Sequence, residues 1–236
     1  MEEEKTQEPA KDAKDESLAQ PKIKDSTFIY AAVFIVIMLL VILFVPRLLN
    51  QSQATLEELH EKNIAGKLSA DKGYMYNGVY SFVLFDNLWY TQVSTPDKKT
   101  IFSIPFHYSP RDVEYINPEG ILNYTNLDKY QNIFVTFDPK DENLKYIAVS
   151  VGEADLTLIK VFGKGVIASC TNNESDACIG RPIVDCNSTD APVVYFASEN
   201  QTKVLYLNNC IIVSGREEEL FKATDRMLFN LLGIMP

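Results

Sequence analysis

The sequence predicts an α+β protein with an N-terminal transmembrane helix followed by an extracytoplasmic domain. We expect this domain to be mainly antiparallel sheet, with a long middle helix and a C-terminal helix packed on it. Three observations lead to this fold class. Residues 27–45 form an uncharged apolar run, aromatic and β-branched segments begin at Tyr74, and two later segments carry apolar residues at helical spacing.

The chain begins with a polar segment, residues 1–26, that is rich in charged residues and almost free of apolar ones. Such a composition cannot bury enough apolar surface to fold, so we predict a disordered acidic cytoplasmic tail. Residues 27–45, "TFIYAAVFIVIMLLVILFV", then run for nineteen residues without a charge. About 20 residues are needed to cross a bilayer as a helix, and bulky residues end the run where a signal peptidase would need small ones. We therefore predict an uncleaved anchor whose partner is the lipid bilayer.

The direction of the anchor is predicted by two features. Five lysines precede it within the tail, whereas fewer basic residues follow closely, which favours a cytoplasmic N-terminus. All five Asn-X-Ser/Thr sequons follow the anchor, and Asn50 is expected to lie too near the bilayer for use. We expect a single-pass protein of the cell membrane with an extracytoplasmic C-terminal domain. The remaining glycosylation candidates are Asn123, Asn173, Asn187 and Asn200.

Residues 46–72 are predicted to form a juxtamembrane helical stalk. Thr55 and Glu58 have the spacing of a capping box, which opens a helix through about Leu68. Its narrow apolar stripe can rest on the domain or pair with another copy. His60 lies in this helix, and we expect it to occupy a solvated position.

Residues 73–236 contain the segments of the predicted extracytoplasmic domain. "YSFVLF" and "LWYTQVS" flank a tight turn at Asp86 and Asn87, and "TIFSIPFHY" follows with Pro105 at a sheet edge or a bulge. An antiparallel meander is expected here. "SPRDVEYINPEG" indicates turns around a short helical piece, and "NIFVTF" indicates another strand.

The middle helix is expected to begin at an Asp138 N-cap and to end near Gly163. An alternative interpretation makes "YIAVSVG" a strand with a shorter helix after it. Farther on, "PVVYFAS" and "KVLYLNN" are predicted to pair as a hairpin around "ENQT", and "CIIVSG" adds a strand. Ser214 and Glu217 are expected to cap the C-terminal helix, which Gly233 closes.

The sequence contains few indications of a catalytic, cofactor-binding or metal-binding site. The formal net charge of -10 argues against nucleic-acid binding, because phosphate recognition needs clustered Lys and Arg. Phosphate-loop, serine-elbow, zinc-helix and calcium-loop motifs are absent from the sequence. We therefore predict no catalytic residue, no cofactor and no metal site. His107 is the histidine of the folded domain that could serve a Cys-His hydrolase, although a strand histidine held by a backbone partner explains it equally well.

Four cysteines, Cys170, Cys178, Cys186 and Cys210, lie close together in the chain. Zinc sites prefer two close pairs of ligands, and these spacings do not match that pattern. An even number of cysteines outside the cytoplasm favours two disulfides, for which three connectivities are open. We prefer Cys170 with Cys178, closing a polar loop, and Cys186 with Cys210.

The ending "NNCIIVSGREEELFKATDRMLFNLLGIMP", with the cysteine stretch and "FDP" before a helix, is similar to uncharacterised single-pass membrane proteins of archaea. The resemblance implies a glycosylated archaeal cell surface as the setting and carries no activity. We predict that the chain binds or scaffolds a protein partner at the cell surface or in the membrane, with an accessory subunit of an envelope assembly as one form of that role. The alternative is a surface hydrolase acting on peptide or glycan, with a site built from dispersed carboxylates or His107.

Overall fold

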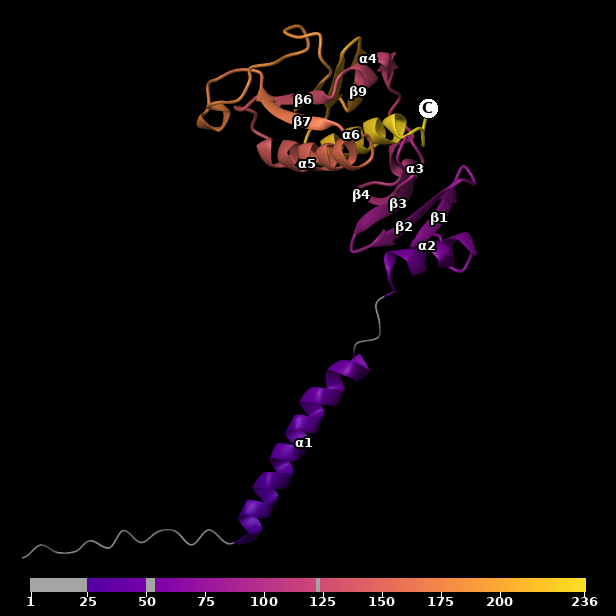
Figure 1. Ribbon diagram of the computed structural model, residues 1–236, viewed down its shortest axis with the longest axis vertical. Helices are drawn as coiled ribbons and strands as arrows, with labels where there is room; N and C mark the ends of the chain where they lie inside the picture. Colours follow the sequence, from indigo (N-terminus) through magenta and orange to yellow (C-terminus); the bar gives the residue numbers. More distant parts are fainter. Residues whose placement is uncertain (1–24, 50–53, 122–123) are drawn as a thin grey trace, which may run out of the picture. The chain divides into compact units, whose positions relative to one another are not determined.

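The computed structural model describes residues 25–49, 54–121 and 124–236, and within it the chain forms two compact units, Met1–Gln53 and Ala54–Pro236 (Figure 1). Residues 1–24 of the predicted tail therefore lie outside the described residues, and so do the sequon asparagines Asn50 and Asn123. The fold is mixed α+β, as the sequence predicts.

The described residues of the first unit form one helix, α1 (Asp25–Leu49), which includes the whole of the predicted anchor. Its described side chains, Tyr30 and residues 32–45, are exposed, and nearly all of them are apolar. Across the described residues no helix is long and apolar enough to cross a membrane. The anchor thus stays a prediction.

The second unit begins with α2 (Leu56–Ile64), which Thr55 caps by accepting a hydrogen bond from the Glu58 N–H at 3.2 Å. Of the two alternatives for this helix, the structure has it resting on the domain. His60 is 2% exposed, and its Nδ1 lies 2.9 Å from Ser81 Oγ on β2. The expectation of a solvated His60 is wrong, because the face of α2 that lies on the meander is made by the polar residues His60 and Asn63, while Ile64 of the predicted apolar stripe is 64% exposed. Burial lowers the pKa of His60, which favours its neutral form.

Strands β1 to β4 form an antiparallel meander in sequential order. The predicted turn is confirmed, since Asp86 and Asn87 both have positive φ, at 54° and 64°, as a tight hairpin requires. Pro105 lies on β4, at the sheet edge, where its missing N–H costs no ladder hydrogen bond. The strands are β1 (Gly73–Tyr76), β2 (Tyr80–Phe85), β3 (Leu88–Ser94) and β4 (Ile101–Phe106).

The second sheet has six strands in the order β5-β9-β10-β8-β6-β7. Strands β7, β6, β8 and β10 are parallel, and only β9 and β5 run the other way. The prediction of a mainly antiparallel sheet is therefore correct for the meander and wrong for this sheet. The strands are β5 (Glu119–Gly120), β6 (Asn132–Phe137), β7 (Gly165–Cys170), β8 (Val193–Ala197), β9 (Lys203–Leu207) and β10 (Cys210–Ser214).

The predicted hairpin of β8 and β9 does not form. Strand β10 lies between them, pairing in parallel with β8 and antiparallel with β9. The tight turn is instead at Asn208 and Asn209, where Asn208 has a φ of 47°. A two-residue Asn-Asn connection favours this hairpin over one through the longer "ENQT" loop.

Two helices cover one face of the six-stranded sheet and contact each other (Figure 1). Helix α5 (Leu144–Lys160) excludes the strand alternative for "YIAVSVG", and it starts at an Asn143 N-cap instead of Asp138. Helix α6 (Glu218–Leu231) contacts β9 and β10, as expected of a terminal helix packed on the sheet. Its predicted capping box is wrong, because Ser214 is the last residue of β10.

The remaining elements are short connections. They are α3 (Pro110–Val113), the predicted short helical piece, α4 (Tyr124–Lys129) and a 3-10 turn, η1 (Asp176–Cys178). One hydrophobic core joins both sheets to α5 and α6. At its centre Phe229 of α6 contacts Phe82 and Phe106 of the meander, with ring centroids 5.7 and 4.6 Å apart.

Candidate functional site

A polar crevice of about 330 Å³ opens at the carboxyl ends of β6, β8 and β10. Three loops build it: the loop that leads from β6 into α5, the loop after β8, and the loop between β10 and α6. Every side chain that lines it is polar or charged. They are Lys140, Asp141, Glu142, Asn143, Ser198, Asn200 and Arg216.

The position of the crevice follows from the strand order. The chain leaves β6 through α5 toward β7, but it leaves β8 toward the other side of the sheet, where β10 and β9 lie. The loops after β6 and β8 therefore diverge and leave a gap between them. In open sheets with parallel strands, ligands bind in the gap at such a switch of direction. The described crevice lies at this place.

Asp141 holds the walls of the crevice together. Its two carboxylate oxygens accept hydrogen bonds from the backbone N–H groups of Asn143 at 2.7 Å and of Ser198 at 3.2 Å. The side-chain amide of Asn143 also donates to Ser198 Oγ at 2.6 Å. The loops after β6 and β8 are thus bonded to each other, which fixes this part of the site before any ligand arrives.

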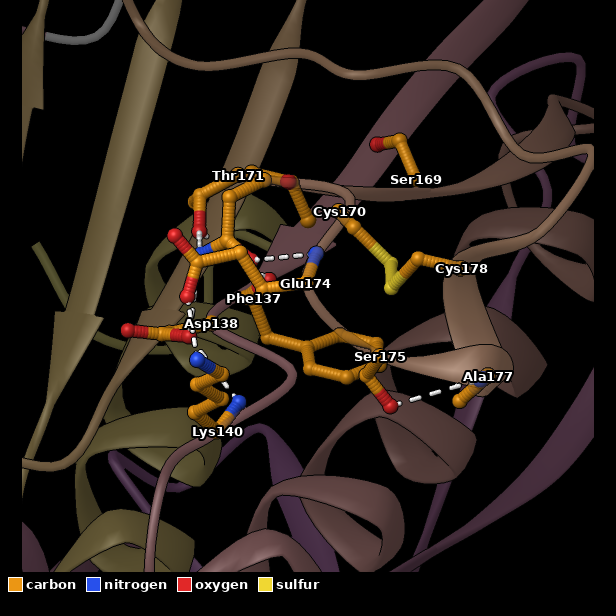
Figure 2. Close-up of a disulfide and its surroundings, with 12 residues drawn as sticks. Phe137, Asp138, Lys140, Ser169, Cys170, Thr171, Glu174, Ser175, Ala177 and Cys178 are labelled. Atoms are coloured by element: carbon orange, nitrogen blue, oxygen red, sulfur yellow. Dashed lines mark hydrogen bonds and ion pairs between the residues drawn. A yellow bond between two sulfur atoms is a disulfide. The ribbon is translucent and has the colours of Figure 1, made fainter.

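Two cations lie on different loops of the crevice. Lys140 forms an ion pair with Glu174, whose carboxylate raises the pKa of the lysine (Figure 2). Arg216 donates from Nη1 to the Asn200 side-chain oxygen at 3.4 Å, a long contact. The guanidinium therefore keeps most of its hydrogen-bonding capacity for another group.

The predicted disulfides are confirmed in the preferred connectivity, Cys170–Cys178 and Cys186–Cys210. Their Cα atoms lie 6.1 and 5.3 Å apart, within the range that disulfides require. Figure 2 shows the first of them at the end of β7, beside the segment that carries Glu174 and close to Asp138 and Lys140. This disulfide fixes the loop that supplies the partner of Lys140.

The sequons within the described residues are accessible. Asn173, Asn187 and Asn200 are all exposed, and each lies on a loop. Asn200 also lines the crevice, so a glycan on this residue would occupy its mouth. Glycosylation of these three residues stays a prediction.

His107 follows β4 and is held by groups from two helices. Its Nδ1 lies 3.0 Å from Glu153 Oε2 on α5, and its ring stacks on Phe221 of α6. The expectation of a backbone partner is wrong, because the partner is a carboxylate whose side chain is 6% exposed. This contact raises the pKa of His107. His107 lines neither the polar crevice nor the small apolar cavity around Leu158 and Phe162.

Behind this pair lies Asp225 of α6, which is fully buried. Its Oδ2 accepts a hydrogen bond from the Tyr108 N–H at 2.7 Å. Burial and the nearby Glu153 carboxyl raise the pKa of Asp225 well above its usual range. We interpret His107 and Asp225, which both interact with Glu153, as two groups that keep their protons to a higher pH in the folded state than in the unfolded chain.

The raised pKa values of His107 and Asp225 predict a pH dependence of stability. A raised pKa in the folded state stabilises the fold below the unfolded pKa, and this contribution is lost as pH rises through the folded pKa. Asp225 and His107 have the same sign, so the free energy of unfolding should decrease above about pH 4 for Asp225 and about pH 6.5 for His107. Each group contributes a slope of up to about 1.4 kcal/mol per pH unit.

Asp225→Asn tests this, since asparagine can still accept from the Tyr108 N–H but no longer titrates. Thermal unfolding measured from about pH 5 to 9 should show a flatter Tm profile for the variant than for the wild type. His107→Gln should remove only the upper part of the decline. Parallel profiles for Asp225→Asn and wild type would contradict the assignment.

Sequence reasoning missed the crevice. Its residues belong to three loops distant in the chain, and no single motif contains them. The available signal is the Asp, Lys and Asn content directly after "NIFVTF", which is equally typical of helix capping. Among the described residues, no group of three or more His, Cys, Asp and Glu side chains could hold a metal ion.

Comparison of the chain with models of protein families, with curated proteins and with solved structures finds no match.

Proposed function

We propose that the chain is a membrane-anchored binding protein whose extracytoplasmic domain takes a small polar ligand in the crevice between β6, β8 and β10. The observation that carries this proposal is the prearranged crevice itself, whose walls Asp141 ties together through two backbone N–H groups. Preorganised polar groups reduce the conformational entropy that the protein itself must lose when a ligand binds.

The location rests on three independent supports. Residues 27–45 are an uncharged apolar run within a helix, the two disulfides suit an oxidising compartment, and three sequons lie on exposed loops. The proposed arrangement has the N-terminus in the cytoplasm and residues 47–236 outside. A glycosylated cell surface is the proposed setting, with a further protein in the membrane or envelope as the partner that responds to the loaded domain.

Binding is favoured over catalysis by the roles of the acidic groups in the crevice. The carboxylate of Asp141 is engaged by backbone donors on both oxygens, which leaves it a structural role. His107, which contacts the carboxylate of Glu153 and could act as a general base, does not line the crevice.

A surface hydrolase is the second candidate function, and the 3.0 Å contact between His107 and Glu153 is the observation that favours it. A carboxylate that contacts Nδ1 orients a histidine so that Nε2 can act as a general base. The side chain of His107 is 31% exposed, so a substrate can reach it. Peptide or glycan hydrolysis lost in His107→Gln would support this candidate.

The topology gives a direct prediction. Protease added outside intact cells should digest the domain from residue 54 onward and leave the N-terminal tail intact, because only the tail is expected inside. Immunoblots with tags at each end measure this. A protected domain with a digested tail would reverse the topology, and permeabilised cells supply the control in which both ends are digested.

The binding function is tested by native mass spectrometry of the full chain purified from membranes. A co-purified small molecule should be present with the wild type and absent from Ser198→Trp, which fills the crevice. Ser94→Trp, at an exposed position at the end of β3 outside the crevice, is the matched control and should keep the ligand. Equal occupancy of all three proteins would place the ligand elsewhere.

A further inference from the structure

We infer that the crevice selects a small zwitterion, a ligand that carries both a carboxylate and an ammonium group, such as a free α-amino acid or a short unblocked peptide. This inference rests on the proposed binding function and names its ligand class. It follows from the size of the cavity, its balance of charges and the hydrogen bonds that its side chains already make.

The size of the crevice limits the ligand. Its volume of about 330 Å³ lies near the lower end of the range that small-molecule sites span, about 300–1,000 Å³. A ligand that lies wholly within the crevice is a single small molecule or a segment of about two residues. The lining side chains are all polar or charged, which favours a polar ligand over an apolar one.

The charges of the lining are balanced. Two cations, Lys140 and Arg216, and two carboxylates, Asp141 and Glu142, line the crevice. Lys140 pairs with Glu174, and Asp141 accepts from two backbone N–H groups, which leaves one group of each sign, Arg216 and Glu142. A ligand with a net charge would leave one sign of these side chains without a partner as it displaces their water. A ligand with one group of each sign leaves neither sign unmatched.

The cationic side of the proposed site is Arg216. Its single described hydrogen bond, to the Asn200 side-chain oxygen, is 3.4 Å long and goes to a neutral group. A carboxylate would replace it with charge-assisted hydrogen bonds in the bidentate geometry that guanidinium groups favour. Lys140 is less suited to this role because it already pairs with Glu174.

The anionic side is Glu142. Asp141 has both oxygens bonded to backbone N–H groups, so it has little capacity left for a ligand. Glu142 is the adjacent residue, is exposed and lines the same crevice. Its carboxylate would accept from the ligand ammonium while Arg216, on a different loop, holds the carboxylate.

The test uses the full chain in lipid nanodiscs and saturation-transfer NMR. The probes are glycine, L-serine, L-glutamate, L-lysine and glycylglycine, with N-acetylglycine and glycinamide as analogues that lack one charge. At least one unblocked probe should bind, and the blocked analogues should bind at least about 10-fold more weakly, since one charged hydrogen bond is worth about 1.5–3 kcal/mol.

Two substitutions assign the charges. Arg216→Ala should weaken the unblocked probe about 10-fold or more, and Glu142→Gln should reduce the preference for glycine over N-acetylglycine. Arg181→Ala removes an exposed arginine outside the crevice and should change neither. Equal binding of N-acetylglycine and glycine, or an unchanged affinity in Arg216→Ala, would overturn the inference.

The two levels of proposal fail differently. If galactose or glucose binds the wild type but not Ser198→Trp, while no unblocked amino acid binds, the ligand class is wrong and the binding function stands. If none of these probes binds and native mass spectrometry detects no crevice ligand, both proposals fail.

Discussion

Replacing Cys186 and Cys210 with serine is expected to lower the free energy of unfolding by about 3–4 kcal/mol. The disulfide joins residues 24 apart in sequence, so its loss frees a long loop in the unfolded chain. It also ties the start of β10 to the loop that precedes β8, and Cys210 is buried among Val184 and Val193. Denaturant unfolding of the full chain, monitored by the single tryptophan, Trp89, measures the change.

The second disulfide is the matched control. Cys170 and Cys178 are only 8 apart in sequence, so their replacement by serine should lower the free energy of unfolding by about 2–3 kcal/mol, less than the loss of Cys186–Cys210. Because both disulfides leave no free thiol among the four cysteines, we also expect the native protein to resist alkylation without reductant. Two alkylated thiols in the untreated protein, or equal costs for the two pairs, would contradict this account.

Phe229→Ala is expected to destabilise the domain by about 3–5 kcal/mol. The ring is fully buried on α6 and contacts Phe82 and Phe106 on two strands of the meander. Its removal leaves a cavity at the only place where three aromatic rings of the described core join the meander to α6, and rigid neighbouring strands cannot close it. Thermal and denaturant unfolding measure the loss.

Phe221→Ala on the same helix provides the comparison. This ring is half-buried and stacks on His107 at the margin of the core, so the same change should cost about 1–2 kcal/mol. Comparable losses in the two variants would show that Phe229 is not a central contact.

Local chemistry determined what the sequence could predict. The turn at Asp86 and Asn87, the Thr55 cap and the existence of α5 depend on residues close together in the chain, and the structure contains all three. Cysteine spacing favours the observed pairing, because the short polar loop between Cys170 and Cys178 closes easily, but it leaves three connectivities open.

Long-range pairing determined what the sequence could not predict. Short apolar strands such as "VVYFA" and "CIIVS" have similar composition whether they pair in parallel or antiparallel, so the insertion of β10 beside β8 leaves no local signal. The burial of His60 depends on long-range contacts in the same way, since its hydrogen-bond partner, Ser81, lies on β2 and not on its own helix. The crevice depends on the same long-range order and was missed with it.

The central position of β10 has a consequence for folding. Every other strand of its sheet precedes it in the chain, yet it must lie between β8 and β9 before the sheet is continuous. Strands β8 and β9 therefore cannot complete their pairing as they emerge during synthesis, and one edge of each is open to incorrect partners until β10 arrives. We expect the closure of the sheet around this strand to limit the folding rate, and the polar crevice to be among the last features to form.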